Sequence, residues 1–206
     1  MPVLNRYDLL QRMLDSVDVS VDHLLVIDNG PGETLTFKEN FKKVTVLNMP
    51  ANLGVSGSWN LGIKSFPYAE RWFLASNDVI FQPGALEKLS QARRDEITLV
   101  SQPPHWQVFA LGDEAVNDIG LFDESLFPAY FEDNDYARRA EFVGVNIRLL
   151  DINVKHDNSS TIKAGYQEKN NKTFAANQRY YDSKMANSDY TQGAWSLEVR
   201  RENGWE

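Results

Sequence analysis

The hydrophobic pattern of the first hundred residues alternates between two periods. Short continuous apolar runs predict buried strands at 24–27, 44–47, 72–75 and 98–100. Between these runs, apolar residues recur at helical spacing, which predicts helices over 6–17 and 54–66 and a third that begins near Pro83. Strands that alternate with helices predict an α/β fold with a mostly parallel sheet flanked by helices. In such sheets ligands bind beyond the carboxyl ends of the strands.

The pattern is more mixed in the second half of the chain. Strands are predicted at 107–111 and 145–150, and helices at 114–119, 134–143 and 166–187. We find no internal repeat and no low-complexity linker. The 206 residues are therefore expected to form one domain, with changes of pattern near residues 101 and 161.

Composition excludes several classes of protein. Hydrophobic residues make up 42% and charged residues 24%, as in an ordinary globular protein. The net charge of −8 argues against nucleic-acid binding, although one metal ion can reverse a local field and admit an anionic ligand. With no cysteine, disulfides, zinc–thiolate sites and cysteine nucleophiles are excluded. No apolar run approaches the roughly 20 residues of a membrane span. The start Met1-Pro2-Val3 does not resemble a signal peptide, so we expect a cytoplasmic protein.

Candidate chemistry lies in four segments: 28–30, 52–57, 76–78 and 132–135. Asp28 and Asp78 each follow a predicted strand, so the fold is expected to bring both to one crevice. Each segment has an ordinary structural alternative. An Asp after a strand is commonly a turn former or a helix cap, and an acidic run is favoured at a helix N-terminus. The four segments together, in this order, are more specific than any one of them.

The chain resembles inverting family 2 glycosyltransferases of the GT-A fold, close to their rhamnosyltransferase-like branch. The resemblance extends from Pro2 to about Thr161. It is carried by the segments Pro2–Arg6, Val26–Gly30, Asn52–Gly54 with Asn60–Ile63, Gly120–Glu124, Tyr130–Asp135 and Lys155–Ser160. The Asn-x-Gly…Asn-x-Gly segment is a very close match to that of the family.

This resemblance implies transfer of a sugar from a UDP- or dTDP-linked donor to an acceptor hydroxyl. Asp28 would accept a hydrogen bond from the N3–H of uracil or thymine. Asp78 stands where the family has the last Asp of its Asp-x-Asp motif and would bind Mn²⁺ or Mg²⁺ together with the donor diphosphate. His156 would be a second ligand or a hydrogen-bond donor to the diphosphate, and an imidazole ligand favours Mn²⁺.

The resemblance also implies a general base and a set of donor contacts. Asp133 would deprotonate the acceptor hydroxyl, with Glu132 and Asp135 as alternatives, because the sequence does not show which side chain faces the crevice. The acceptor is a glycan, a lipid or a protein. The nucleotide-binding half would span about 1–101, the acceptor and catalytic half about 102–161, and a helical extension 162–206. The donor would be bound by Val3, Asn5, Asp28, Asn52, Gly54, Gly57, Asn60 and Asn77.

The chain departs from the family pattern at two places. Ser76 replaces the first Asp of the Asp-x-Asp motif, so metal binding rests on one carboxylate and is expected to be tight only together with the donor. Only Met1 precedes Pro2, where the family has a hydrophobic strand. Either the chain starts upstream of Met1 or residues 2–4 form a short stub of that strand.

Two other functions are compatible with parts of this pattern. A nucleotidyltransferase would have a similar α/β sheet, but it usually carries a Gly-rich loop after its first strand, which Pro2–Arg6 lacks. A non-catalytic glycan-binding or scaffold domain could have kept the fold, and Ser76 favours that alternative. Among single residues, Trp59 is expected in the core, Trp106 either in simple packing or against an acceptor sugar, and Arg138 or Arg139 either paired with the acidic run or solvated.

Overall fold

The first sheet of the protein is parallel and lies at the N-terminal side of the molecule. The structure, a computed structural model, describes residues 1–156, 167–188 and 190. In the first sheet, β2 (Leu24–Asp28) lies between β1 (Pro2–Val3) and β3 (Val44–Asn48). β1 is a two-residue stub, and the amino group of Met1 extends its ladder by donating to the carbonyl of Leu25. The predicted strands at 24–27 and 44–47 are confirmed.

The second sheet is mixed. Its strand order is β4-β7-β6-β8, formed by Arg71–Ala75, Val108–Gly112, Glu96–Val100 and Asn146–Leu150. β7 runs antiparallel to both of its neighbours, whereas β6 and β8 are parallel. The α/β class is confirmed, but the parallel pairing does not continue from β3 into β4. A strand's partner is chosen by contacts distant in sequence, which the alternation of elements does not reveal.

A small third sheet was not predicted. β5 (Val79–Phe81) pairs antiparallel with β9 (Val154–His156). Each strand has three residues, too few to show a period in the sequence. The register aligns Val79 with His156 and so brings β9 against the turn that follows β4.

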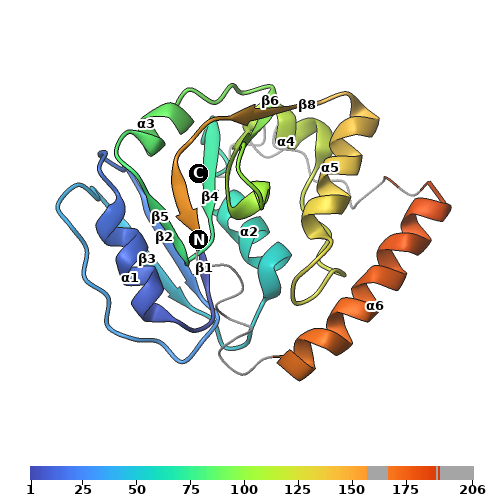
Figure 1. Ribbon diagram of the computed structural model, residues 1–206, viewed down its shortest axis with the longest axis horizontal. Coiled ribbons are helices and arrows are strands. Elements are labelled where there is room, and N and C mark those ends of the chain that lie inside the picture. Colours follow the sequence, from blue (N-terminus) through green and yellow to red (C-terminus); the bar gives the residue numbers. More distant parts are fainter. Residues whose placement is uncertain (157–166, 189, 191–206) are drawn as a thin grey trace.

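The helices surround these sheets and agree with the predicted ranges (Figure 1). They are α1 (Tyr7–Ser16), α2 (Gly54–Ser65), α3 (Ala85–Leu89), α4 (Asp113–Ile119), α5 (Glu132–Val143) and α6 (Gln167–Ala186), with a 3-10 turn η1 at His105–Gln107. α1 covers the first sheet, and α6 lies at the opposite end of the molecule beyond α5 (Figure 1). Among the described residues, no helix is long and apolar enough to cross a membrane.

Two apolar clusters form the core. One joins α1 to β2, β5 and α3, and the other is centred on the aromatic rings of Trp59, Phe109, Phe122 and Tyr136. Trp59 packs edge-on to Phe109, so its predicted place in the core is confirmed. Trp106 also packs against Phe109, which supports its reading as a packing residue. The second cluster joins α2, through Trp59 and Ile63, to α5, through Tyr136 and Ala140.

Candidate donor and catalytic site

Asp78 and His156 are 78 residues apart in the sequence and meet in the fold. Asp78 lies in the turn between β4 and β5, and the β5–β9 pairing places His156 Nε2 3.0 Å from Asp78 Oδ1. The two side chains line a pocket of about 210 Å³ together with Leu9, Arg12, Ile80 and Lys155. The two residues predicted as metal ligands are therefore brought together, and two basic side chains share their pocket.

The donor atoms of this pair suit a divalent cation. A carboxylate oxygen and an imidazole nitrogen are ligands that Mn²⁺ accepts, whereas Mg²⁺ prefers oxygen alone. His156 Nδ1 is buried, and no described residue gives it a hydrogen bond. Within residues 1–156, 167–188 and 190, no group of three or more His, Asp or Glu side chains forms a complete metal site. An ion held by Asp78 and His156 would therefore take further ligands from a bound donor.

Asp28 ends β2 and is almost fully buried. Its Oδ1 accepts hydrogen bonds from the hydroxyl of Tyr7, at 2.5 Å, and from the backbone N–H of Gly30, at 2.9 Å. Burial and the bond to Asp28 raise the pKa of Tyr7 to about 12, so the phenol remains a donor at neutral pH. Asp28 is thus held in one orientation by its neighbours. Its role in reading the nucleotide base stays a prediction.

The segment from Asn52 to Gly57 begins α2 beside the end of β2. Asn52 Oδ1 accepts the N–H of Gly54, and Asn29 Oδ1 accepts the N–H of Leu53. Gly54 has φ +71°, and a Cβ there would come within 2.8 Å of the Phe127 ring and of the Pro128 carbonyl oxygen. Only glycine fits this close approach, because any larger residue would push the segment at 127–128 away from α2.

The remaining predicted donor contacts divide into two groups. Val3 pairs with Asp28 in register, and the Asn77 amide donates to the carbonyl of Asn5 at 3.1 Å, so these residues gather at the ends of β1, β2 and β4. Asn60 is different. Its buried side chain donates to the Phe122 carbonyl and to Glu124, and it accepts the N–H of Phe122. Its geometry joins α2 to the Gly120–Glu124 turn, while its predicted contact with the donor remains untested.

The acidic run occupies the first turn of α5, which begins at Glu132, two residues before the predicted start. Glu132 is buried, and its Oε2 has no hydrogen-bond partner among the described residues. Burial, with the nearby charge of Asp133, raises the pKa of Glu132 to about 8. Asp133 is more exposed, accepts the N–H of Asn134 at 2.8 Å, and has its pKa raised by burial.

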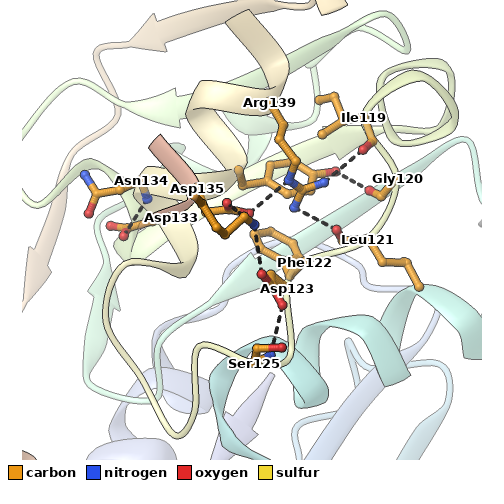
Figure 2. Close-up of polar contacts among 12 residues, drawn as sticks. Ile119, Gly120, Leu121, Phe122, Asp123, Ser125, Asp133, Asn134, Asp135 and Arg139 are labelled. Carbon is orange, nitrogen blue, oxygen red and sulfur yellow. Dashed lines mark hydrogen bonds and ion pairs between the residues drawn. The ribbon is translucent and has the colours of Figure 1, made fainter. Parts of the chain in front are cut away.

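Asp135 has a different environment from Glu132 and Asp133, and Figure 2 shows it beside Arg139. It is buried and pairs with Arg139 Nε at 2.9 Å and with Lys184 Nζ at 2.5 Å. Arg139 also donates to the carbonyls of Ile119 and Leu121. Of the two arginines that follow the acidic run, Arg139 therefore pairs with it, whereas Arg138 pairs with Glu141. Asp135 is buried in two ion pairs and is not available to a substrate, so Asp133 and Glu132 are the remaining candidates for a base.

Sequence reasoning did not single out Tyr7, Asn29 or Lys184. Asn29 lies inside the segment 28–30 and Tyr7 directly follows Pro2–Arg6, so their positions in the sequence are a signal that could have found them. Lys184 has no such signal, because it lies in a polar helix far along the chain from its partners Asp123, 61 residues away, and Asp135. The segment Lys155–Ser160, which carries part of the family resemblance, continues into residues 157–160, and these lie outside the described residues.

Comparison with known proteins supplies the class. Residues 1–107 match the family described as glycosyl transferase family 2, so the chain belongs to that family. Among solved structures, it is similar to the mannosyltransferase PcManGT from Pyrobaculum calidifontis in complex with GDP-Man and Mn²⁺, with a TM-score of 0.56 and 12% sequence identity. That likeness covers 72% of this chain and 52% of the other, so the chain spans about half of its length. A search of curated proteins finds no match.

Proposed function

We propose that this protein transfers a sugar from a UDP- or dTDP-linked donor to an acceptor hydroxyl, with inversion at the anomeric carbon and with the help of Mn²⁺ or Mg²⁺. The observation that carries the proposal is the Asp78–His156 pair in a pocket that also holds Arg12 and Lys155. A carboxylate and an imidazole suit a metal ion, and the basic side chains suit the oxygens of a diphosphate.

Asp78 and His156 are the residues that would hold the ion. When bound, the ion supplies Lewis-acid chemistry that offsets the negative charge developing on the leaving nucleoside diphosphate. Arg12 and Lys155 add positive charge to the lining of the same pocket and favour binding of the donor itself. Ser76 does not supply a second carboxylate, so metal and donor are expected to bind together.

Asp133 is the proposed general base. Direct displacement requires that the acceptor hydroxyl lose its proton as its oxygen attacks the anomeric carbon and the bond to the diphosphate breaks. Glu132 remains protonated up to a pH of about 8 and so places no second negative charge beside Asp133. The base is therefore the more exposed carboxylate of the two, and its buried neighbour stays neutral at pH 7.

Asp28 is the residue proposed to recognise the nucleotide base. A fixed carboxylate such as Asp28 accepts a hydrogen bond from the N3–H of uracil or thymine, and it would also accept one from the N1–H of guanine. The solved structure with the related fold contains GDP-Man, so a guanine nucleotide is the natural competitor in any test.

Isothermal titration with UDP, dTDP and GDP, each with and without Mn²⁺, tests the proposal. We expect a uracil or thymine nucleotide to bind more tightly with Mn²⁺ than without it, and the Asp78→Asn variant to lose the effect of the metal. Asp118→Asn, a change at an exposed carboxylate of α4, is the matched control and should bind like the wild type. Tight binding of GDP alone would move the donor to a guanine nucleotide, and no binding of any nucleotide would overturn the proposal.

A further inference from the structure

The helix α6 packs against the segment that leads into the acidic run. Asn177, buried on α6, donates from its side-chain amide to the carbonyl of Ala129 at 2.9 Å and, at 3.4 Å, to that of Tyr130. On the same helix, Phe174 packs against the rings of Tyr130 and Phe131. Three consecutive residues immediately before Glu132 are therefore in contact with a helix that lies more than 40 residues further along the chain.

This segment has a backbone that needs support. Tyr130 and Phe131 both have left-handed conformations, with φ +81° and +72°. Such conformations cost about 1–3 kcal/mol each for bulky residues and persist where surrounding contacts determine them. Phe131 is also the N-cap of α5, so its conformation sets the direction in which the first turn, with Glu132 and Asp133, leaves the segment. Contacts that hold Phe131 therefore hold Asp133.

Lys184, two turns further along α6, joins α6 to both sides of the catalytic half. Its Nζ lies 2.8 Å from Asp123 Oδ2 and 2.5 Å from Asp135 Oδ1. Asp135 also pairs with Arg139, which holds the backbone at Ile119 and Leu121 (Figure 2). The side chains of Asp123, Asp135 and Lys184 are each only 4% exposed. We call Asp123, Asp135, Arg139 and Lys184 the buried charge cluster; its two negative and two positive side chains balance.

We propose that α6 positions the base of this enzyme, with Lys184 and Asn177 as its positioning residues. This inference rests on the proposed function in which Asp133 is the base. Neither residue needs to touch the substrates. Asn177 holds the backbone before Phe131, and Lys184 keeps the Gly120–Glu124 turn against α5.

Loss of Lys184 would shift the turn at 120–124 relative to α5. Asp123 and Asp135 would be left with Arg139 alone, and the uncompensated negative charge would drive the turn at 120–124 away from α5. Asn60 ties the same turn to α2, on the donor side of the site. Movement of the turn would thus change the position of Asp133 relative to the donor, which affects kcat more than donor binding.

The test compares Lys184→Met with Lys172→Met, a matched change at an exposed lysine of the same helix. Hydrogen exchange would be followed in peptides covering 127–136, and turnover measured with UDP-glucose, dTDP-rhamnose and GDP-mannose. We expect Lys184→Met to speed exchange of 127–136 at least about tenfold and to lower kcat about tenfold or more with an almost unchanged donor KM, as misplacement of reacting groups does. Lys184→Arg, which keeps the charge, should recover most of the lost kcat.

Two further arms keep the test decisive. If Lys184→Met does not fold, the double variant Asp123→Asn/Lys184→Met is measured instead. It leaves Asp135 paired with Arg139 and so removes the repulsion, but it still lacks the Lys184 link between the turn and α5, so a smaller loss of kcat and faster exchange over 127–136 are expected. Hydrogen exchange needs no substrate, so it tests the role of α6 even if none of the three donors is turned over. Exchange over 127–136 and a kcat that both equal those of Lys172→Met would overturn the inference.

Discussion

The molecule contains two groups of charged and polar side chains with different surroundings. One is the pair Asp78 and His156, and the other is the buried charge cluster of Asp123, Asp135, Arg139 and Lys184. The side chains of Asp78 and His156 are 8% and 14% exposed and line a pocket that holds two more basic residues. Those of the cluster are at most 4% exposed, and their charges balance within the protein. The first arrangement can exchange a protein contact for a ligand. The second has no charge left for one, and it fixes backbone segments relative to one another.

Asp133 lies beside the cluster without belonging to it, and its loss should have the largest effect on activity. Asp133→Asn removes the proposed base, so kcat is expected to fall by about 10²–10⁴ while nucleotide affinity stays within about twofold. Steady-state kinetics and titration check the two quantities. Glu132→Gln is the control, because Glu132 is already neutral at pH 7 and the amide should keep most of the activity. Equal losses in both variants would contradict the assignment.

The cluster and the pocket should differ sharply in stability. Arg139→Met leaves two buried carboxylates with one lysine and is expected to lower the free energy of unfolding by about 3–5 kcal/mol. Asp78→Asn, in the lining of the pocket and nearly equal in shape, should change it by less than about 1 kcal/mol. Urea denaturation of the two variants measures both. The comparison fails if Asp78→Asn is the more destabilising change.

The effect of Mn²⁺ on nucleotide binding should depend on the Asp78–His156 pair and not on the buried charge cluster. His156→Ala is expected to weaken binding of the nucleotide in the presence of Mn²⁺ about tenfold or more, since even residues behind metal ligands contribute 10–100-fold. Without metal, the variant should bind nearly as the wild type does. Lys184→Arg should leave the effect of Mn²⁺ unchanged, because Lys184 does not line the pocket and pairs with Asp123 and Asp135 instead. Titration with and without Mn²⁺ distinguishes these outcomes.

The dependence of stability on pH should also have opposite signs at two carboxylates. The folded-state pKa of Glu132 is raised to about 8, so the native state holds a proton that the unfolded chain loses above its ordinary pKa of 4.5. Between pH 5 and 8, stability should therefore fall with rising pH by up to about 1.4 kcal/mol per unit relative to Glu132→Gln. Urea denaturation at several pH values measures this slope. An identical slope in Glu132→Gln would rule out a protonated Glu132.

At Asp123 the sign is reversed. Burial alone would raise its pKa, but hydrogen bonds from Lys184 and Ser125 lower it below the ordinary value of 3.8. Its contribution to stability is present above that value and is lost as the pH falls through the lowered pKa. Acid unfolding of Asp123→Asn should therefore be less steep than that of the wild type at low pH.

The smallest effect is expected at an exposed pair of the same chemistry. Arg93 and Asp95 are bonded at 2.7 Å, with side chains 67% and 51% exposed. Solvent and salt screen such a pair, so Arg93→Ala should produce no measurable change in stability or activity. Denaturation and kinetics of this variant calibrate the others, since a clear loss there would mean that charge removal in general, and not burial, explains the effects at the cluster.

Much of the fold was predictable from local pattern. The period of apolar residues identified α1, α2 and α5 and the strands of the first sheet, because a helix or strand that packs on a core must repeat its apolar positions. The same logic did not reveal β5 and β9, which are too short to repeat, or the reversed direction of β7, which depends on partners distant in sequence.

The candidate site divides in the same way. The sequence predicts Asp78, His156 and the acidic run at 132–135 as candidate site residues, and the structure brings Asp78 and His156 together. The sequence does not show which of Glu132, Asp133 and Asp135 is the candidate base, because this depends on which carboxylates pair with a cation in the fold. Lys184 pairs with Asp135, and no motif around Lys184 indicates this contact.

By itself, the sequence determined which elements form and which side chains are available for chemistry, since both follow from local residue order. Only the tertiary structure decided what those side chains do. It made Asp78 and His156 neighbours through a three-residue strand pairing, and it placed Asp135 between two cations while leaving Asp133 more exposed. The reason is physical: the effect of a charged group depends on its burial and its partners, and both are set by contacts between residues far apart in the chain.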